Sequence, residues 1–243
     1  MDYDKIGVGY CNYRIPDPRI RKRLEKALGN PETLLNVGAG VGSYEPIECD
    51  VVALEPSRIM IEQRSPLGAA VVQGRAEQLP FPDKSFDVAM GVLTLHHWQD
   101  WQQGLHEVMR VTRDRVVLIS WVGFVNRFWL LDYLPELGDI DRDAFPSLDD
   151  IEAVCGCKAS DDVLPIPANC SDGFLCAWWR RPSAYLQADI RASISIFSTM
   201  ENVASRLQRL QDDLVSGVWQ ARNRDILGRP YMDYGYRIIT LKP

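Results

Sequence analysis

The sequence predicts an α/β protein whose core is a doubly wound, mostly parallel, seven-stranded sheet. Three observations favour this fold. An apolar strand over residues 33–37 runs directly into a loop, residues 38–42, with three alternating glycines. A second apolar run, residues 51–54, ends in Glu55, seventeen positions after the first glycine. Apolar strands and amphipathic helices then alternate along the chain, as they do when helices cover both faces of a parallel sheet.

The first half of the chain follows this alternation in order. Residues 18–28 form a helix because apolar side chains recur every fourth position and Gly29 supplies a stop signal. Ser57 and Asp100 are N-caps for helices that begin one residue later, the first of them covering residues 58–63. The parallel strands are expected near residues 33–37, 51–54, 70–73, 86–90 and 116–121.

The second half completes the sheet and adds an insertion. Residues 162–166 are expected as a sixth strand and residues 234–241 as an antiparallel seventh. Between them lie about sixty residues, far more than a hairpin needs. They contain two amphipathic helical patterns, over residues 183–197 and 202–215. The chain is therefore divided into a first segment, a cofactor-binding core, a helical insertion and a returning strand, residues 1–30, 31–167, 168–230 and 231–243.

The glycine loop and Glu55 together indicate a nucleotide-binding βαβ unit. Glycines let the backbone turn tightly and approach a ligand closely, and a carboxylate can accept hydrogen bonds from both ribose hydroxyls. The third glycine comes one residue earlier than in a dinucleotide fingerprint, where Ser43 stands instead. This G-x-G-x-G spacing, followed by an acid-terminated strand, resembles the class I S-adenosylmethionine-dependent methyltransferases.

Three further motifs carry the resemblance beyond the loop. Glu55-Pro56-Ser57, followed by Met60, looks like the ribose-binding turn of that superfamily. Residues 76–87 match the string A-E-x-L-P-F-x-D-x-S-F-D, and Leu95-His96-His97 follows the fourth strand. In this order and spacing the motifs are similar to the type 11, small-molecule branch, which includes the ubiquinone-type methyltransferases. The resemblance covers residues 34–121.

The resemblance implies S-adenosylmethionine as the cofactor, in a Rossmann-like methyltransferase fold. Glu55 would hold the ribose, Ala76 and Glu77 would lie against the adenine, and Arg14 would pair with the cofactor carboxylate from a leader that closes as a lid. Asn36 departs from the pattern, since most members carry an acid there. The implied cofactor-binding residues are Asn36, Gly38, Ala39, Gly40, Gly42, Glu55, Pro56, Met60, Ala76, Glu77, Val92 and Arg14.

Candidate catalytic residues lie on the acceptor side. His96 and His97 follow a parallel strand at the edge where ligands bind, and an imidazole suits a general base. The alternative is that they only pack at a helix start. Asp172 is a second candidate, for orienting the acceptor or removing its proton, although Asp172-Gly173 is also ordinary turn chemistry. In the family, helical insertions often roof the acceptor pocket; here a plain structural hairpin or a homodimer contact is the alternative.

Composition narrows the partners. The net charge of −6 and the absence of a long basic run disfavour a nucleic-acid substrate. No apolar run is long enough to span a bilayer and no signal peptide is evident, so the expected location is cytoplasmic, with reduced thiols. Cys155-Gly156-Cys157 lacks zinc-ligand spacing, so no metal site is expected.

The sequence as a whole predicts an enzyme that transfers a methyl group from S-adenosylmethionine to a small-molecule acceptor by in-line displacement. Clustered aromatic residues near 174–179 favour a flat or apolar acceptor. Two alternatives stay open. One is a noncatalytic S-adenosylmethionine-binding or assembly protein, and the other, opposed by Ser43, is an NAD-type oxidoreductase.

Overall fold

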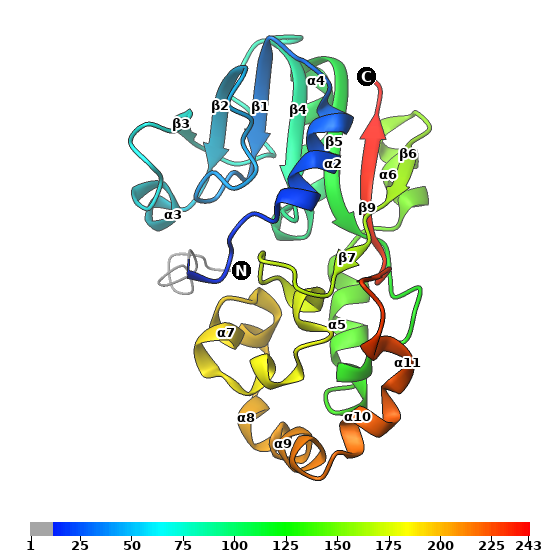
Figure 1. Ribbon diagram of the computed structural model, residues 1–243. Helices are drawn as coiled ribbons and strands as arrows, with labels where there is room; N and C mark the ends of the chain where they lie inside the picture. Colours follow the sequence, from blue (N-terminus) through cyan, green and yellow to red (C-terminus); the bar gives the residue numbers. More distant parts are fainter. Residues whose placement is uncertain (1–11) are drawn as a thin grey trace.

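The computed structural model describes residues 12–243, without the side chains of residues 140–143. Its sheet has seven strands in the order β3-β2-β1-β4-β5-β9-β6 (Figure 1). Six of them run parallel, and β9 runs antiparallel between β5 and β6. The predicted fold class is thereby confirmed. The strands are β1 (Thr33–Val37), β2 (Asp50–Glu55), β3 (Ala70–Gln73), β4 (Phe86–Val92), β5 (Thr112–Trp121), β6 (Ser160–Val163) and β9 (Tyr236–Leu241).

Helices cover both faces of the sheet. Helix α2 (Pro18–Leu28) lies on one face, and α4 (Trp101–Val111) and α6 (Leu148–Cys155) lie on the other (Figure 1). Strand β5 shows why two layers form, because Val117 and Ile119 pack with the α2 side whereas the alternate Val116 and Leu118 pack with the α4 side. The sheet is apolar on both faces, as buried parallel strands are.

The expected N-caps are present. The Asp100 side chain accepts a hydrogen bond from the backbone of Gln103, and the Ser57 side chain accepts one from Met60 at the start of α3 (Arg58–Glu62). Both caps lie where a strand end turns into a helix, at the edge of the sheet that carries the ligand loops.

The predicted sixth strand is wrong in its bounds. Strand β6 ends at Val163, and the chain then leaves the sheet through Leu164 and Pro165. Proline lacks the backbone N–H that a ladder needs, so it marks the exit. The next two residues form β7 (Ile166–Pro167), which pairs with β8 (Tyr231–Met232) in a separate small ribbon.

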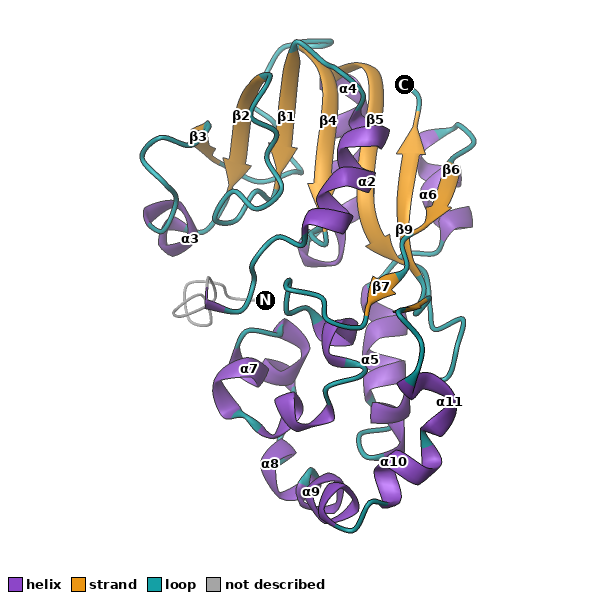
Figure 2. Cartoon of the chain, in the orientation of Figure 1, coloured by secondary structure: helices purple, strands orange, loops and turns teal. Residues whose placement is uncertain are grey.

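A helical region lies below the carboxyl ends of the strands (Figure 2). The single helix expected over residues 183–197 is wrong, because Ile194 has extended backbone angles and the Ser193 hydroxyl bonds back to Ile190. The pattern over 202–215 is likewise divided at Leu207. The helices here are α5 (Leu137–Ala144), α7 (Ala188–Ala192), α8 (Val203–Arg206), α9 (Gln208–Val215), α10 (Val218–Arg222) and α11 (Arg224–Leu227), with 3-10 turns at Trp129–Asp132, Leu175–Trp178, Pro182–Leu186 and Ser195–Thr199.

Large aromatic rings hold this region together. Trp129 and Trp219 are buried with their ring centroids 5.1 Å apart, and the Trp129 indole N–H donates to the carbonyl of Trp179 at 2.6 Å. Each such ring removes about 150–250 Å² from water, which offsets the shortness of the helices. Within residues 12–243, no helix is both long enough and apolar enough to cross a lipid bilayer.

Candidate functional site

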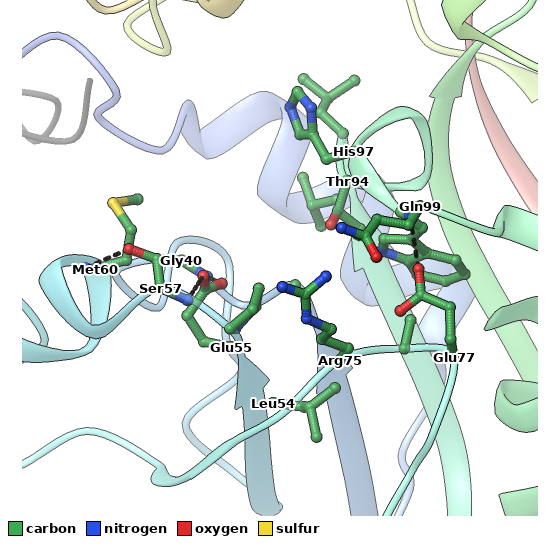
Figure 3. Close-up of a pocket in the computed structure, with 16 residues that line it drawn as sticks. Gly40, Leu54, Glu55, Ser57, Met60, Arg75, Glu77, Thr94, His97 and Gln99 are labelled. Carbon is green, nitrogen blue, oxygen red and sulfur yellow. Dashed lines mark hydrogen bonds between the residues drawn. The ribbon is translucent and has the colours of Figure 1, made fainter. Parts of the chain in front are cut away.

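A cleft of about 240 Å³ opens at the carboxyl ends of β1, β2, β3 and β4 (Figure 3). Ligands of open α/β sheets bind at this edge. Nine of the residues predicted for the site line it: Gly38, Gly40, Glu55, Pro56, Met60, Ala76, Glu77, Val92 and His97. Ser57, which belongs to the predicted ribose-binding turn, also lines it, as do six residues that the sequence did not assign to the site: Leu54, Arg75, Leu93, Thr94, Trp98 and Gln99.

The glycine loop approaches the cleft with bare backbone. Gly38 has φ +67°, and a Cβ built on it would lie 1.9 Å from the Thr94 hydroxyl oxygen. The Gly40 N–H donates to Glu55 Oε2 at 2.7 Å, and the Ser57 N–H donates to Oε1 at 2.9 Å (Figure 3). Glu55 therefore holds the loop and the turn before α3 together. Each of its oxygens has the capacity to accept a second hydrogen bond, as a ribose diol would require.

Most members of the family carry an acid at the position of Asn36, and in this chain a carboxylate, that of Glu45, lies within hydrogen-bond distance of Asn36. The Asn36 amide donates to Glu45 Oε1 at 3.0 Å, and the Arg64 guanidinium donates to both carboxylate oxygens of Glu45, at 2.7 and 2.8 Å. Arg64 also donates to the carbonyl of Gly40. Asn36, Ala39 and Gly42, which were predicted for the site, are not among the residues that line the cleft. Glu45 and Arg64 were missed because their pairing joins segments far apart in the sequence.

The motif at Ala76 and Glu77, which is predicted to lie against the adenine, is anchored to the turn after β4. Glu77 Oε1 accepts hydrogen bonds from the backbone N–H groups of Gln99, at 2.6 Å, and Asp100, at 3.2 Å. Arg75, one residue before the predicted Ala76, extends its guanidinium into the cleft between Glu55 and Thr94 (Figure 3). The Arg75 carbonyl accepts a hydrogen bond from the Gln78 N–H, but no hydrogen bond or ion pair joins its guanidinium to the described residues. Its position beside a recognised motif was the signal that could have identified it.

A second cavity, of about 90 Å³, adjoins the cleft. Leu93 and His97 line both, so the two spaces meet at these side chains. Leu93 has φ +50°, a left-handed conformation that non-glycine residues rarely adopt outside functional sites. The remaining lining residues are His96, from the same segment as Leu93 and His97, and residues from six further segments of the chain: Arg14, Trp121, Ala144, Phe145, Phe174, Leu175, Ile194, Ser195, Ile196, Thr199 and Tyr236.

The rings of the two predicted histidines are in contact at the junction, tilted by 47°. Their ring centroids are 3.7 Å apart, and His96 stacks on Phe145 at 4.0 Å. Burial lowers the pKa of His97 to about 3 and that of His96 well below 6.5, with the Arg14 cation acting in the same direction. Both rings are therefore neutral near pH ~7. The Nδ1 atom of His96 is buried and has no hydrogen-bond partner among the described residues.

Asp172 lies outside both cavities and is 2% exposed. It accepts hydrogen bonds from the Arg14 Nε at 2.6 Å and from the Tyr44 hydroxyl at 2.9 Å. The neighbouring Gly173 N–H donates to the carbonyl of Tyr13. Asp172 thus joins the N-terminal segment, the glycine loop and the insertion.

The predicted leader is only partly within the structure. Arg14 lines the second cavity and pairs with Asp172. Of the other leader residues predicted for the lid, Tyr13 and Pro16 are described, whereas Tyr3, Ile6, Gly7 and Tyr10 lie outside the described residues. Over residues 12–243, no three His, Cys, Asp or Glu side chains group as a metal site would require.

Comparisons with known proteins agree with this geometry. Residues 35–120 match the family model described as a methyltransferase domain. The uncharacterized methyltransferase YcgJ of Bacillus subtilis is 30% identical over 115 residues, which is 42% of each chain. The first curated relatives are thus matched over about half of their length or less.

One solved structure is similar along almost the whole chain. It is described as a methyltransferase from an antibiotic biosynthesis pathway of Anabaena variabilis, with 30% identity and a TM-score of 0.87 over 94% of this chain and 98% of that one. The [4+2]-cyclase SpnF is 14% identical with a TM-score of 0.54, covering 92% of this chain and 79% of that one. At that identity the likeness concerns the fold alone.

Proposed function

This chain belongs to the class I S-adenosylmethionine-dependent methyltransferases, and on that premise we propose that it methylates a small-molecule acceptor bound in the second cavity. The observation that carries the proposal is the junction at Leu93 and His97. A methyl donor in the cleft and an acceptor in the cavity meet there, with no other side chain common to both linings. The helical region then serves as the roof of the acceptor site.

The cleft residues fit the cofactor of this family. Glu55 is placed to receive the ribose hydroxyls, Ala76 and Glu77 to flank the adenine, and the bare backbone at Gly38 to admit the methionine end. S-adenosylmethionine has no phosphate group, and a glycine loop whose backbone can come close to the ligand suits such a cofactor. Arg14, held by Asp172, is assigned to the acceptor side rather than to the cofactor carboxylate.

When bound, S-adenosylmethionine supplies a methyl group on a sulfonium that is already a good leaving group. The task of the chain is then to hold the acceptor in line with that methyl group and to exclude water. Alignment of this kind is worth on the order of 7–11 kcal/mol for well-oriented reactants. His96 and His97, neutral and desolvated, are placed to accept a proton from an acceptor that must lose one. Asp172 is assigned a positioning role, because its oxygens hold Arg14 and Tyr44.

The test is calorimetric titration with S-adenosylhomocysteine. We expect wild-type protein to bind it and Glu55→Ala to bind at least about tenfold more weakly, since hydrogen bonds to a charged group are worth about 1.5–3 kcal/mol each. The matched control is Glu62→Ala, which removes an exposed carboxylate of α3 that pairs only with Arg58. No binding by folded wild-type protein would overturn the proposal, and tighter binding of NAD would replace it with an oxidoreductase.

A turnover measurement distinguishes the proposed methyltransferase from the noncatalytic alternative. A protein that binds S-adenosylmethionine for assembly alone has no use for an acceptor space beside the cofactor cleft. Formation of S-adenosylhomocysteine with any acceptor excludes this alternative, whereas tight cofactor binding without turnover on a broad acceptor panel supports it.

A further inference from the structure

The described residues that line the second cavity are mostly apolar and include no acidic side chain. Aromatic rings and aliphatic chains form most of its wall, with Phe145, Phe174 and Tyr236 among the rings. Among the described lining residues, the one formally charged side chain is Arg14, which is ion-paired with Asp172 at 2.6 Å. A cationic acceptor would therefore meet an arginine and no carboxylate, which is unfavourable in a desolvated space.

The cavity is also small. Its volume is about 90 Å³, compared with the roughly 150 Å³ engineered cavity that accommodates one benzene molecule. A single ring with part of its edge in the junction to the cleft fills this space. A second fused ring would need more space than this volume, and the lining side chains Ile194 and Ile196 are buried, 4% and 6% exposed.

One polar atom in the wall still needs a partner. The Nδ1 atom of His96 is buried and makes no hydrogen bond with the described residues. A buried polar atom left unsatisfied is costly, and one in a ligand cavity is often satisfied by the ligand. Because the ring is neutral, it can accept a hydrogen bond from a hydroxyl.

We propose that the second cavity binds a neutral acceptor with a single aromatic ring, whose hydroxyl group hydrogen-bonds to the His96–His97 pair. This inference rests on the proposed function. A phenol is the simplest molecule of the class. The flat ring lies among Phe145, Phe174 and Tyr236, and the hydroxyl points toward the junction where the methyl group arrives.

The reaction balances without a further reactant. The phenolic oxygen attacks the methyl carbon, the new C–O bond forms as the C–S bond breaks, and the sulfur keeps that electron pair as S-adenosylhomocysteine. The O–H bond breaks and its proton passes to an imidazole nitrogen of the pair, then to water. A phenolic oxygen that is being methylated becomes a very strong acid, so an imidazole of lowered basicity still accepts the proton.

The test measures the binding of four small molecules to protein saturated with S-adenosylhomocysteine, and then turnover with S-adenosylmethionine. One of the four is a simple phenol, and each of the other three changes one feature of it. We expect 4-methylphenol to bind most tightly. Toluene, which lacks the hydroxyl, is expected to be weaker by at least about threefold. Tyramine, which adds an ammonium group, and 2-naphthol, which adds a ring, are expected to be weaker by at least about tenfold. Tighter binding of tyramine or 2-naphthol than of 4-methylphenol would overturn the inference.

A pair of variants tests the histidine. His96→Phe keeps a ring against Phe145 but removes both nitrogens. His106→Phe is the matched control, since His106 is exposed and its ring makes a hydrogen bond with the carbonyl of Val154. We expect His96→Phe to lose the preference for 4-methylphenol over toluene while its affinity for S-adenosylhomocysteine is unchanged. An unaltered preference refutes the assigned hydrogen bond. Failure of wild-type protein to bind S-adenosylhomocysteine refutes the proposed function, and this inference with it.

Discussion

The cofactor cleft and the second cavity differ in how they are built. The cleft is formed by short motifs that each follow one strand, and its key contacts are made by backbone groups, as at Gly40 and Ser57. The second cavity is formed by side chains from segments as far apart as Arg14 and Tyr236. A site built from local motifs can be found in a sequence, whereas one built by tertiary packing is found only once the chain is folded.

Asp172 connects the two regions, so its removal should have the largest effect. Asp172→Ala removes the buried carboxylate that pairs with the partly buried Arg14 guanidinium and accepts a hydrogen bond from the Tyr44 hydroxyl. Removing one member of a buried ion pair costs about 3–5 kcal/mol. We expect a fall of this size in the free energy of unfolding, measured with urea, together with weaker binding at both sites.

The control for this variant is Asp114→Ala, which removes a half-exposed partner of Arg115 and should change stability by less than about 0.5 kcal/mol. If Asp172→Ala impairs only the acceptor reaction, with unchanged stability, Asp172 would instead belong to the catalytic machinery.

Among the residues of the cleft, we expect Gly38 to tolerate substitution least. A Cβ there would overlap the Thr94 hydroxyl, and the backbone has φ +67°. We expect Gly38→Ala to lower the free energy of unfolding by about 1–3 kcal/mol and to abolish binding of S-adenosylhomocysteine. Gly228→Ala is the control, because a Cβ at Gly228 meets no atom within 4 Å. Normal cofactor binding by Gly38→Ala would show that the loop adapts, and that the cleft is less dependent on bare backbone than its geometry indicates.

The sequence predicted the sheet and the cleft for the same reason. Strand and helix patterns in α/β proteins are local, and the glycine loop, Glu55 and Ala76 follow strands at fixed spacing. The prediction from the sequence failed for segments whose secondary structure depends on tertiary contacts. The segment 183–197 has a helical pattern but is broken at Ile194, where packing against the aromatic core overrides propensity.

Two further features that the sequence did not predict lie outside the cleft lining, and they too depend on contacts between separate segments. Arg64 reaches Glu45 from another loop, and no spacing in the sequence predicts that bond. Asp172 was assigned to chemistry because an acid near aromatic residues suits an acceptor site. Its bonds to Arg14 and Tyr44 are visible only in the folded chain.

The histidine pair gives the second cavity a pH signature. Folding lowers the pKa of His97 to about 3 and lowers that of His96, so unfolded chains bind more protons than folded ones from about pH 6.5 downward. Stability should therefore be lost as the pH falls through this range, by up to about 1.4 kcal/mol per pH unit for each histidine.

The measurement is urea unfolding at about pH 7 and about pH 5, compared between wild type and His96→Phe. The variant should lose the share of the pH dependence that His96 contributes. An identical dependence in both proteins would mean that His96 titrates normally, and that the second cavity is wetter than its apolar lining indicates.

Arg75 allows the finest test of the cleft, and the smallest effect is expected there. Its guanidinium enters the cleft on the side assigned to the adenine, and it makes no hydrogen bond or ion pair with the described residues (Figure 3). Stacking of an exposed guanidinium on an aromatic face is worth about 0.5–1 kcal/mol. We expect Arg75→Gln to weaken binding of S-adenosylhomocysteine about two- to fivefold, and Arg58→Gln, an exposed arginine of α3, to have no effect. A larger loss at Arg75 would mean that a side chain absent from the recognised motifs contributes as much as the motifs themselves, and the contrast between a backbone-built cleft and a side-chain-built cavity would no longer hold.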